Sequence, residues 1–299
     1  MANDEISFGE DGRGKPKLKR FLCDVKEGVT YPSIWDFVPL NTNGSSEMAQ
    51  IFDNPTIFES PKPVGLIQEM LSLGTKSDSI ILDFFGGSGS TGHAVMLQNL
   101  KDSGTRRFIV IQLPELTPAD SEASKTGYVT IAKLTEERRR RAGKKIRAEN
   151  PMFAGDLGFR VFKLDSSNIR EWEPDRDHLT EALQSSIDHL KTNRTETDIL
   201  FELLLKLGLD LCTPVEQRSL AGKAVHSIGA GTLLVCLADV ITREEVEPLA
   251  LGIADWHDAL APAGESTVVF RDSAFADDVA KTNLTAILQQ HGLDNVRSL

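Results

Sequence analysis

The sequence predicts an α/β protein with a Rossmann-like, doubly wound parallel sheet followed by a second, smaller α/β domain. The chain has 299 residues, and such a length is typical of roughly two domains of about 150 residues each. Short apolar runs alternate with amphipathic segments in both halves, which is the pattern of α/β folds. Residues 1–150 hold 20 Lys+Arg and 20 Asp+Glu, whereas residues 151–299 hold 13 and 24 and carry the whole net charge of −11. We therefore place the domain boundary between residues 155 and 156.

The first sixty residues contain few structural signals. The first twenty residues are rich in Gly and Lys, and we expect them to form a loose arm. A polar stretch, NTNGSSE, follows at residues 41–47. Two X-Pro pairs then keep residues 60–63 extended, because proline restricts the residue before it. Apolar residues recur at helical spacing from residue 64, and Gly74 ends the predicted helix.

A βαβ unit is predicted next. Residues 79–85 read SIILDFF, a short unbroken apolar run that predicts a strand buried on both faces. Residues 91–104 predict a helix, and residues 106–115, RRFIVIQLPE, predict a second buried strand. This order of elements gives parallel pairing. A helix with a strongly basic end is expected over residues 127–149.

The second half repeats the alternation of helices and strands. Helices are predicted over residues 179–190, 195–208, 242–253 and 280–292, and strands over residues 232–239, 266–273 and 294–299. This order suggests the second α/β domain. We find no catalytic constellation in it, and its negative charge disfavours contact with nucleic acid.

The glycine turn after the first predicted strand is the candidate binding site. Residues 87–92, GSGSTG, fit the G-x-G-x-x-G pattern and open a helix, so the backbone can approach a ligand there. Asp83 argues against a dinucleotide, because its carboxylate would repel a pyrophosphate. It suits S-adenosylmethionine, which carries an ammonium and a sulfonium. No Gly-Lys-Ser/Thr follows, which excludes a P-loop, while a turn without ligand remains the bland alternative.

Two segments resemble known motifs of DNA amino-methyltransferases. Residues 83–95, DFFGGSGSTGHAV, resemble motif I of that family, and residues 58–71, FESPKPVGLIQEML, resemble motif X, which precedes motif I in the group with permuted motif order. Residues 106–115 and the end of the chain from residue 268 resemble the methylation (Mod) subunits of type III restriction–modification systems. The resemblance therefore covers nearly the whole chain.

The resemblance implies a cofactor, S-adenosylmethionine, and a set of residues that bind it. Residues 1–155 would be a partial methyltransferase domain, in which the motif X residues close over the methionine part of the cofactor. Gln112 or Glu115 would accept hydrogen bonds from the ribose hydroxyls. The cofactor-binding residues implied are Phe58, Ser60, Pro61, Lys62, Asp83, Phe84, Phe85, Gly87, Ser88, Gly89, Gln112 and Glu115.

The catalytic loop of the family is missing from this sequence. Adenine N6 is a poor nucleophile, and the family's Asp/Asn-Pro-Pro-Tyr loop accepts its hydrogens while an aromatic ring stacks on the flipped base. The chain contains no Pro-Pro pair. We therefore expect the C-terminal portion of a longer subunit, with no catalytic residue of its own, which does not methylate DNA unaided. The target would be adenine N6, with cytosine N4 as the alternative.

The resemblance also implies partners. DNA would be bound through the complete enzyme, and residues 156–299 would serve association, as a homodimer or with the helicase–nuclease restriction subunit. Seven cationic residues between positions 138 and 147 are either a solvated helix face or a contact for phosphate or for a partner. The other functions considered are a non-catalytic assembly module with a vestigial pocket and a dinucleotide-dependent enzyme.

The remaining composition excludes several classes. No apolar run approaches the ~18 residues that a membrane span needs, and the N-terminus lacks the apolar core of a signal peptide. Three cysteines, widely spaced, fit a cytoplasmic location. The histidines are scattered, so we predict no metal.

Overall fold

The computed structural model describes residues 5–19, 21–24, 28, 30–170, 190–191 and 193–299. The chain divides into two compact units, residues 1–161 and residues 162–299. This division follows residue 161, while the boundary placed from the charge balance follows residue 155.

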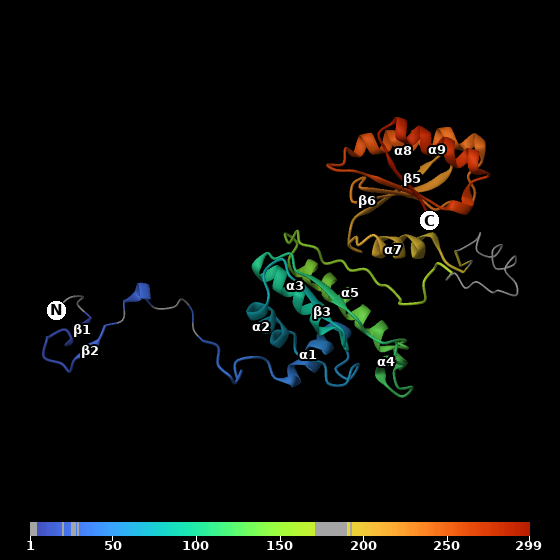
Figure 1. Cartoon of the computed structure of the whole chain (residues 1–299). Helices are drawn as coiled ribbons and strands as arrows, with labels where there is room; N and C mark the ends of the chain where they lie inside the picture. The colour runs from blue at the N-terminus through green and yellow to red at the C-terminus, as the bar shows by residue number, and fades with distance from the viewer. Residues whose placement is uncertain (1–4, 20, 25–27, 29, 171–189, 192) are drawn as a thin grey trace, which may run out of the picture. The chain divides into compact units, whose positions relative to one another are not determined.

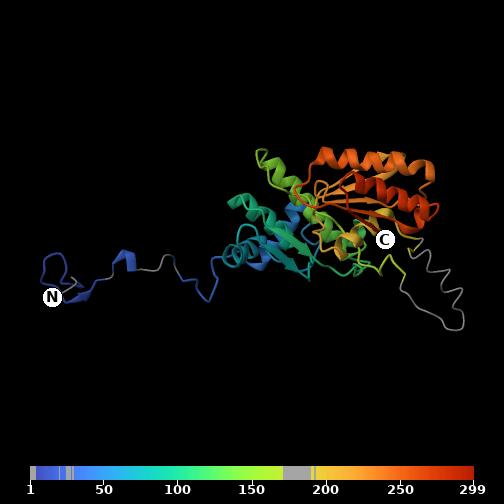
Figure 2. The same cartoon turned by 45° about the horizontal axis from the view of Figure 1, so that its top comes forward.

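The first unit consists of helices around a two-stranded parallel sheet (Figure 1). In chain order its elements are β1 (Ile6–Ser7), β2 (Lys17–Leu18), the 3-10 helix η1 (Leu22–Asp24), α1 (Asn41–Phe52), α2 (Val64–Gly74), β3 (Ile80–Asp83), α3 (Ser90–Asp102), β4 (Arg107–Val110), α4 (Glu122–Lys125) and α5 (Ile131–Glu149). Strands β1 and β2 pair antiparallel. Strands β3 and β4 pair parallel, with α3 between them in sequence, and lie side by side in Figure 2.

Helix α1 is an element that the sequence prediction missed. The polar stretch at residues 41–47 forms its first half. Gly44 is buried there, and a Cβ at this position would lie 2.0 Å from the carbonyl oxygen of Pro61. The helix can therefore pack directly onto the extended X-Pro segment, while Met48 and Phe52 enter the core on the same side. Tertiary packing overrides a weak local helix signal here.

The strands β3 and β4 form as predicted, but the expectation that both faces are buried is wrong. Ile81 and Phe108 pack against α2 and α3 in one core cluster. The alternate residues face the other way, and Ile80 and Leu82 are 54% and 56% exposed. In a two-stranded sheet, successive side chains point to opposite faces, and in the described part of this unit the core covers one of them.

The second unit contains a five-stranded mixed sheet. Its elements are α7 (Glu196–Lys206), β5 (Val215–Leu220), β6 (Lys223–Ile228), β7 (Leu233–Cys236), α8 (Arg243–Leu260), β8 (Thr267–Phe270), the 3-10 helix η2 (Asp272–Ala274), α9 (Asp278–Gln290) and β9 (Asn295–Ser298). The strand order is β5-β6-β7-β8-β9. The pairs β5–β6 and β6–β7 are antiparallel, and the pairs β7–β8 and β8–β9 are parallel.

Most predicted elements of the second half are present. Three strands and three helices form where expected, whereas the predicted helix over residues 179–190 falls almost wholly outside the described residues. The hairpin β5–β6 was missed, because β5 is an edge strand whose central residues are exposed and polar, so it lacks the apolar alternation of a half-buried strand.

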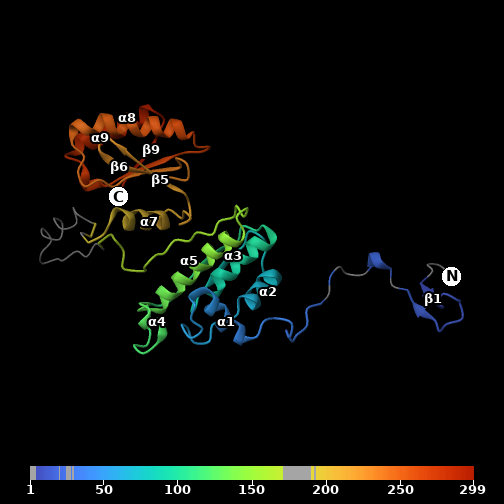
Figure 3. The same cartoon turned by 180° about the vertical axis from the view of Figure 1, so that it is seen from behind.

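Helices cover both faces of this sheet (Figures 1 and 3). Leu234 and Cys236 of β7 point to the core formed with α8 and α9. Leu233 and Val235 of the same strand point to the core formed with α7. Alternate residues of one strand thus enter two separate cores, which makes the second unit a three-layer α/β structure.

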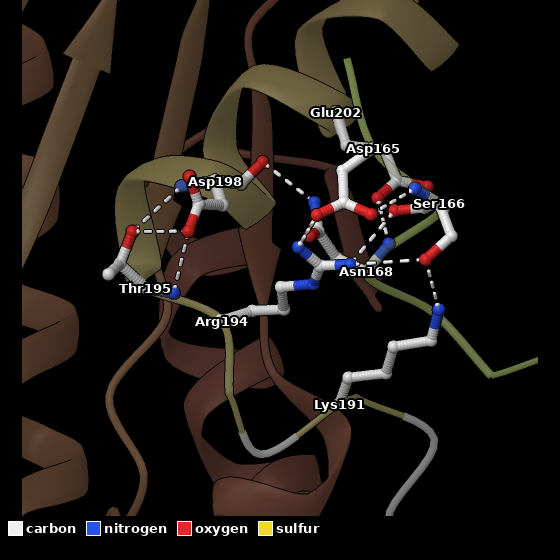
Figure 4. Close-up of polar contacts among 8 residues, drawn as sticks. All are labelled: Asp165, Ser166, Asn168, Lys191, Arg194, Thr195, Asp198 and Glu202. Carbon is white, nitrogen blue, oxygen red and sulfur yellow. Dashed lines mark hydrogen bonds and ion pairs between the residues drawn. The ribbon is translucent and has the colours of Figure 1, made fainter. Parts of the chain in front are cut away.

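Polar contacts fix the beginning of the second unit onto α7 (Figure 4). Arg194, just before the helix, pairs with the carboxylate of Asp165 at 2.9 Å. Glu202, within the helix, accepts a hydrogen bond from the backbone nitrogen of Asn168 at 2.6 Å. Hydrogen bonds from Arg194 and from the backbone of Ser166 lower the pKa of Asp165, so the pair stays charged well below neutral pH.

Candidate functional site

The glycine-rich turn joins the end of β3 to the start of α3 and lies against the end of β4. The backbone nitrogen of Gly86 donates to the carbonyl of Ile111 at 2.9 Å, and that of Gly89 donates to the carbonyl of Gly86 at 2.7 Å. Gly87 and Gly89 have φ of +50° and +81°, values that glycine adopts with little cost. The turn is therefore tight, and the residue pattern is needed to form it.

Two of the glycines are explained by packing. A Cβ on Gly86 would lie 2.5 Å from a methyl carbon of Val110 on β4, and a Cβ on Gly89 would lie 3.0 Å from the carbonyl oxygen of Thr135 on α5. Any larger residue at either position would push the turn away from its neighbours. These two glycines hold the turn against the body of the unit.

Gly87 differs from them because its surroundings are more open. A Cβ there would lie 3.7 Å from the carbonyl oxygen of Phe85 and 3.8 Å from ring atom Cζ of Phe58, which are ordinary contact distances. The side chain of Phe85 is 82% exposed. The accessible side of the turn at Gly87 is therefore bounded by backbone and by the ring of Phe58.

Asp83 lies at this turn with a half-buried carboxylate. One carboxylate oxygen accepts from the backbone nitrogen of Phe85 at 3.0 Å, and the other accepts from the hydroxyl of Thr91 at 2.5 Å. Within the described part of the chain, Asp83 makes no ion pair. Each carboxylate oxygen can accept a further hydrogen bond, so the group can still bind a cationic ligand while it holds the turn.

The predicted motif X segment reaches the same turn. The hydroxyl of Ser90 donates to the carbonyl oxygen of Lys62 at 2.7 Å, and Phe58 lies beside Gly87. Pro61 is buried, while the side chains of Ser60 and Lys62 are exposed. The structure thus brings the two segments together through a backbone carbonyl and an aromatic ring.

Gln112 also reaches the turn. Its Oε1 accepts a hydrogen bond from the backbone nitrogen of Gly87 at 2.7 Å, and its Nε2 donates to the carbonyl of Leu113 at 3.2 Å. The side chain therefore orients the amide plane at Gly87. Glu115 is exposed, and its backbone carbonyl accepts from the nitrogen of Ile131.

Arg138 and Glu47 support the turn from its buried side. Neither was selected as a site residue from the sequence. The guanidinium of Arg138 is fully buried and donates to the hydroxyls of Ser88 and Ser90 at 2.8 and 2.7 Å. It also pairs with Glu47 at 3.4 Å. Glu47 in turn accepts from the backbone nitrogen of Val64, at the start of α2. Ser88 therefore points into the unit, away from the accessible side.

Burial shifts the pKa of both charged groups in this network. Desolvation raises the pKa of Glu47, opposed by the Val64 hydrogen bond and by Arg138. Desolvation lowers the pKa of Arg138 to about 10, opposed by Glu47. Arg138 remains cationic at neutral pH and holds the two serine hydroxyls in place.

The basic run at residues 138–147 was interpreted as a solvated helix face or as a contact for phosphate or a partner. Neither interpretation holds for its first two residues. Arg138 and Arg139 are buried, so they belong neither to a solvated face nor to a phosphate contact. A signal was available in the sequence: Arg138 lies four residues from both Leu134 and Ala142, which are buried. Residues at that spacing share one helix face.

His93, on the first turn of α3, is a packing residue. It is buried, and its Nδ1 has no partner within the described residues. Desolvation lowers its pKa to about 3, and the charges of Arg138 and Lys145 add to the shift. The imidazole is therefore neutral at physiological pH.

Two kinds of feature are absent from the described residues. They contain no group of three His, Cys, Asp or Glu residues placed to hold a metal ion. Within the same residues, no helix combines the length and the apolar character needed to cross a membrane.

The turn and the two motif segments lie in a part of the chain that is similar in sequence to DNA methylases. Residues 4–117, which include the turn and both motif segments, match the family model described as DNA methylase. The resemblance to that family seen in the sequence is therefore confirmed.

Several curated relatives of the chain are Mod subunits of type III restriction-modification enzymes. The chain is 36% identical over 163 residues to the Mod subunit of the type III restriction-modification enzyme StyLTI of Salmonella typhimurium, covering 54% of this chain and 25% of that protein. It is 31% identical over 277 residues to the EcoP15I Mod subunit of Escherichia coli, covering 92% and 40%. It is 33% identical over 241 residues to the EcoPI Mod subunit of Escherichia phage P1, covering 80% and 36%. The chain therefore spans less than half the length of these relatives.

Proposed function

We propose that this chain is the S-adenosylmethionine-binding portion of a type III DNA amino-methyltransferase, with adenine N6 as the target. The observation that carries the proposal is the position of the Phe58 ring beside Gly87, where a Cβ would lie 3.8 Å from its Cζ. This position brings the motif X segment and the motif I segment together at one turn. Asp83 adds a carboxylate without an ion pair among the described residues, which favours a cationic donor over a diphosphate.

The residues present fit that cofactor. When bound, S-adenosylmethionine would supply a methyl group activated by its sulfonium. Asp83 would accept from its ammonium or balance its positive charge, Gly87 would allow its backbone to approach, and Gln112 would keep the Gly87 amide in position. Phe58 and the exposed Phe85 would cover its apolar surface. Ser88 and Gly89 would act by building the turn, since both are buried.

The other implied residues contribute at the edges of the site. Ser60, Pro61 and Lys62 would close over the methionine part. Phe84 packs against Phe85 with ring centroids 5.1 Å apart and would support that ring. Glu115 is exposed, and its carboxylate would accept from the ribose hydroxyls.

The bare face of the β3–β4 sheet supports the proposal that this domain is partial. Parallel sheets are normally covered on both faces, and here Ile80, Leu82 and Ile109 are about half exposed. We infer that further polypeptide, including the Asp/Asn-Pro-Pro-Tyr loop, completes a Rossmann-like sheet on this side. DNA would be bound and methylated by the complete enzyme. The second unit would serve association, in a homodimer or with a restriction subunit.

Calorimetric titration of the whole chain tests the cofactor proposal. We expect S-adenosylhomocysteine to bind with one site per chain, and NAD not to bind. Binding of NAD would instead support a dinucleotide enzyme, and binding of neither would support an assembly module. Transfer of radiolabel from S-adenosylmethionine to duplex DNA by this chain alone would contradict the proposal that the domain is partial.

A further inference from the structure

A hollow lies in the first unit, away from the glycine turn. It has a volume of about 400 Å³. Its lining comes from the C-terminal half of α5 and from the segment that follows it: Arg140, Gly143, Lys144, Arg147, Leu157, Gly158, Phe159 and Val161. None of these lining residues carries a carboxylate, and three of them are cationic.

The cations of this hollow lie on one face of α5. Positions 140, 144 and 147 are separated by four and three residues, which places them in a row along the helix. Arg140 pairs with Glu137 at 2.8 Å and with Glu136 at 3.7 Å. Lys144 and Arg147 are exposed, and in the described part of the chain neither makes an ion pair. Two uncompensated positive charges therefore face the hollow.

This arrangement separates the basic run into groups with different roles. Arg138 and Arg139 point inward, and Arg141 pairs with Glu137 at 2.8 Å. The cations at positions 144 and 147 are left for a ligand. A run that is uniform in sequence thus presents a localised cationic site.

The segment that follows α5 adds apolar residues to the lining. Leu157, Phe159 and Val161 supply carbon surface, and the guanidinium carbon of Arg140 lies 5.8 Å from the centre of the Phe159 ring. The backbone nitrogen of Gly158 is already bound to the carboxylate of Asp156 at 2.7 Å. Recognition would therefore come from the side-chain cations and from contact with the apolar residues of the lining.

We propose that this hollow binds the sugar-phosphate backbone of DNA. A row of cations beside carbon surface matches a ligand in which phosphates alternate with sugar rings, whereas an isolated small anion would leave the apolar residues of the lining unused. Such contacts position a protein on DNA without reading its sequence. The choice of DNA as the polyanion rests on the proposed function, but the site is separate from the cofactor turn.

Fluorescence anisotropy with a labelled DNA duplex at low salt tests the proposal on the whole chain. The double variant Lys144→Glu/Arg147→Glu should weaken binding at least tenfold. It should also lower the slope of log K against log salt by about two, because each phosphate contact contributes about 0.9. The matched control is Lys76→Glu/Lys101→Glu, which makes the same charge change at two exposed lysines of the same unit and should cost less than threefold.

Equal losses in both double variants, or no binding of DNA by the unmodified chain, would overturn the proposal. Preferential binding of inorganic triphosphate through Lys144 and Arg147, without DNA binding, would also overturn it. The affinity for S-adenosylhomocysteine should be the same in both double variants and the unmodified chain. Failure of the cofactor proposal would appear in that titration alone, so the two failures are distinguishable.

Discussion

The guanidinium of Arg138 donates a hydrogen bond to the hydroxyl of Ser88 at 2.8 Å, although 50 residues separate them in sequence. This hydrogen bond fixes the glycine turn relative to α5. The same guanidinium reaches Glu47, which binds the start of α2. The turn is therefore held by a buried polar network as well as by its glycines.

Replacing Arg138 by Met should destabilise the first unit by about 3 kcal/mol, because removing one partner of a buried pair leaves the other uncompensated. Glu47 and the two serine hydroxyls would lose their donor. Urea unfolding followed by pulse proteolysis measures the change for this unit. As a control, Arg147→Met on the exposed side of the same helix should change stability by less than about 0.5 kcal/mol. Similar values for both variants would contradict the structural role of Arg138.

The buried His93 should make the first unit less stable in acid. Its pKa is about 3 in the folded protein, against an ordinary histidine value of 6.5, so between these pH values the unfolded chain binds a proton that the folded chain excludes. The free energy of unfolding should fall as pH decreases through this window, by up to about 1.4 kcal/mol per pH unit. In His93→Gln, the slope of the free energy of unfolding against pH should be smaller by that amount. The control His291→Gln, at an exposed position, should keep the original slope, and an unchanged slope in His93→Gln would refute the assignment.

Gln112→Leu should weaken binding of S-adenosylhomocysteine about fivefold, since the Gly87 amide loses a hydrogen bond worth about 1 kcal/mol. Gln112→Glu keeps an acceptor and should retain most of the affinity. Calorimetric titration of the two variants measures the difference. If Leu and Glu at this position bind equally, the Gly87 contact does not organise the site.

The exposed sheet face predicts an alternating response along β3. Leu82→Lys should change the stability of this chain by less than about 0.5 kcal/mol, as expected for an exposed position. Ile81→Lys, on the packed side of the same strand, should cost more than about 3 kcal/mol, because it buries an unpaired charge. A large loss in Leu82→Lys, with a shift to smaller size in gel filtration, would show that a second copy covers this face.

Local sequence patterns were sufficient to predict the βαβ unit of the first half. The strand β3, the helix α3 and the strand β4 follow from their apolar periodicity and from the glycines between them. Helix α1 escaped notice because Gly44 is unfavourable in an isolated helix and is needed only where Pro61 approaches. The exposure of Leu82 could not be foreseen, since an apolar run indicates burial without saying which polypeptide provides it.

The candidate site likewise contains residues that sequence motifs indicate and residues that only the folded structure reveals. Asp83, Gly87 and Phe58 could be selected from motifs, and they lie at one turn. Glu47 was not selected, because its hydrogen bond with Arg138 joins residues 91 positions apart. Arg138 was treated as one cation among seven, although its spacing from Leu134 and Ala142 indicated a buried face. Contacts distant in sequence leave no local pattern, and the network behind the turn consists of them.

The most direct test of the account compares Asp83 with Asp83→Asn in calorimetric titrations with S-adenosylhomocysteine. Asparagine can still accept from the Phe85 nitrogen through Oδ1, and its Nδ2 can donate to the Thr91 hydroxyl oxygen, so the turn is retained while the negative charge is removed. We predict that the variant loses at least about 1.4 kcal/mol of binding free energy, a factor of ten in Kd. Equal affinity in the two proteins would contradict the claim that this carboxylate selects a cationic ligand.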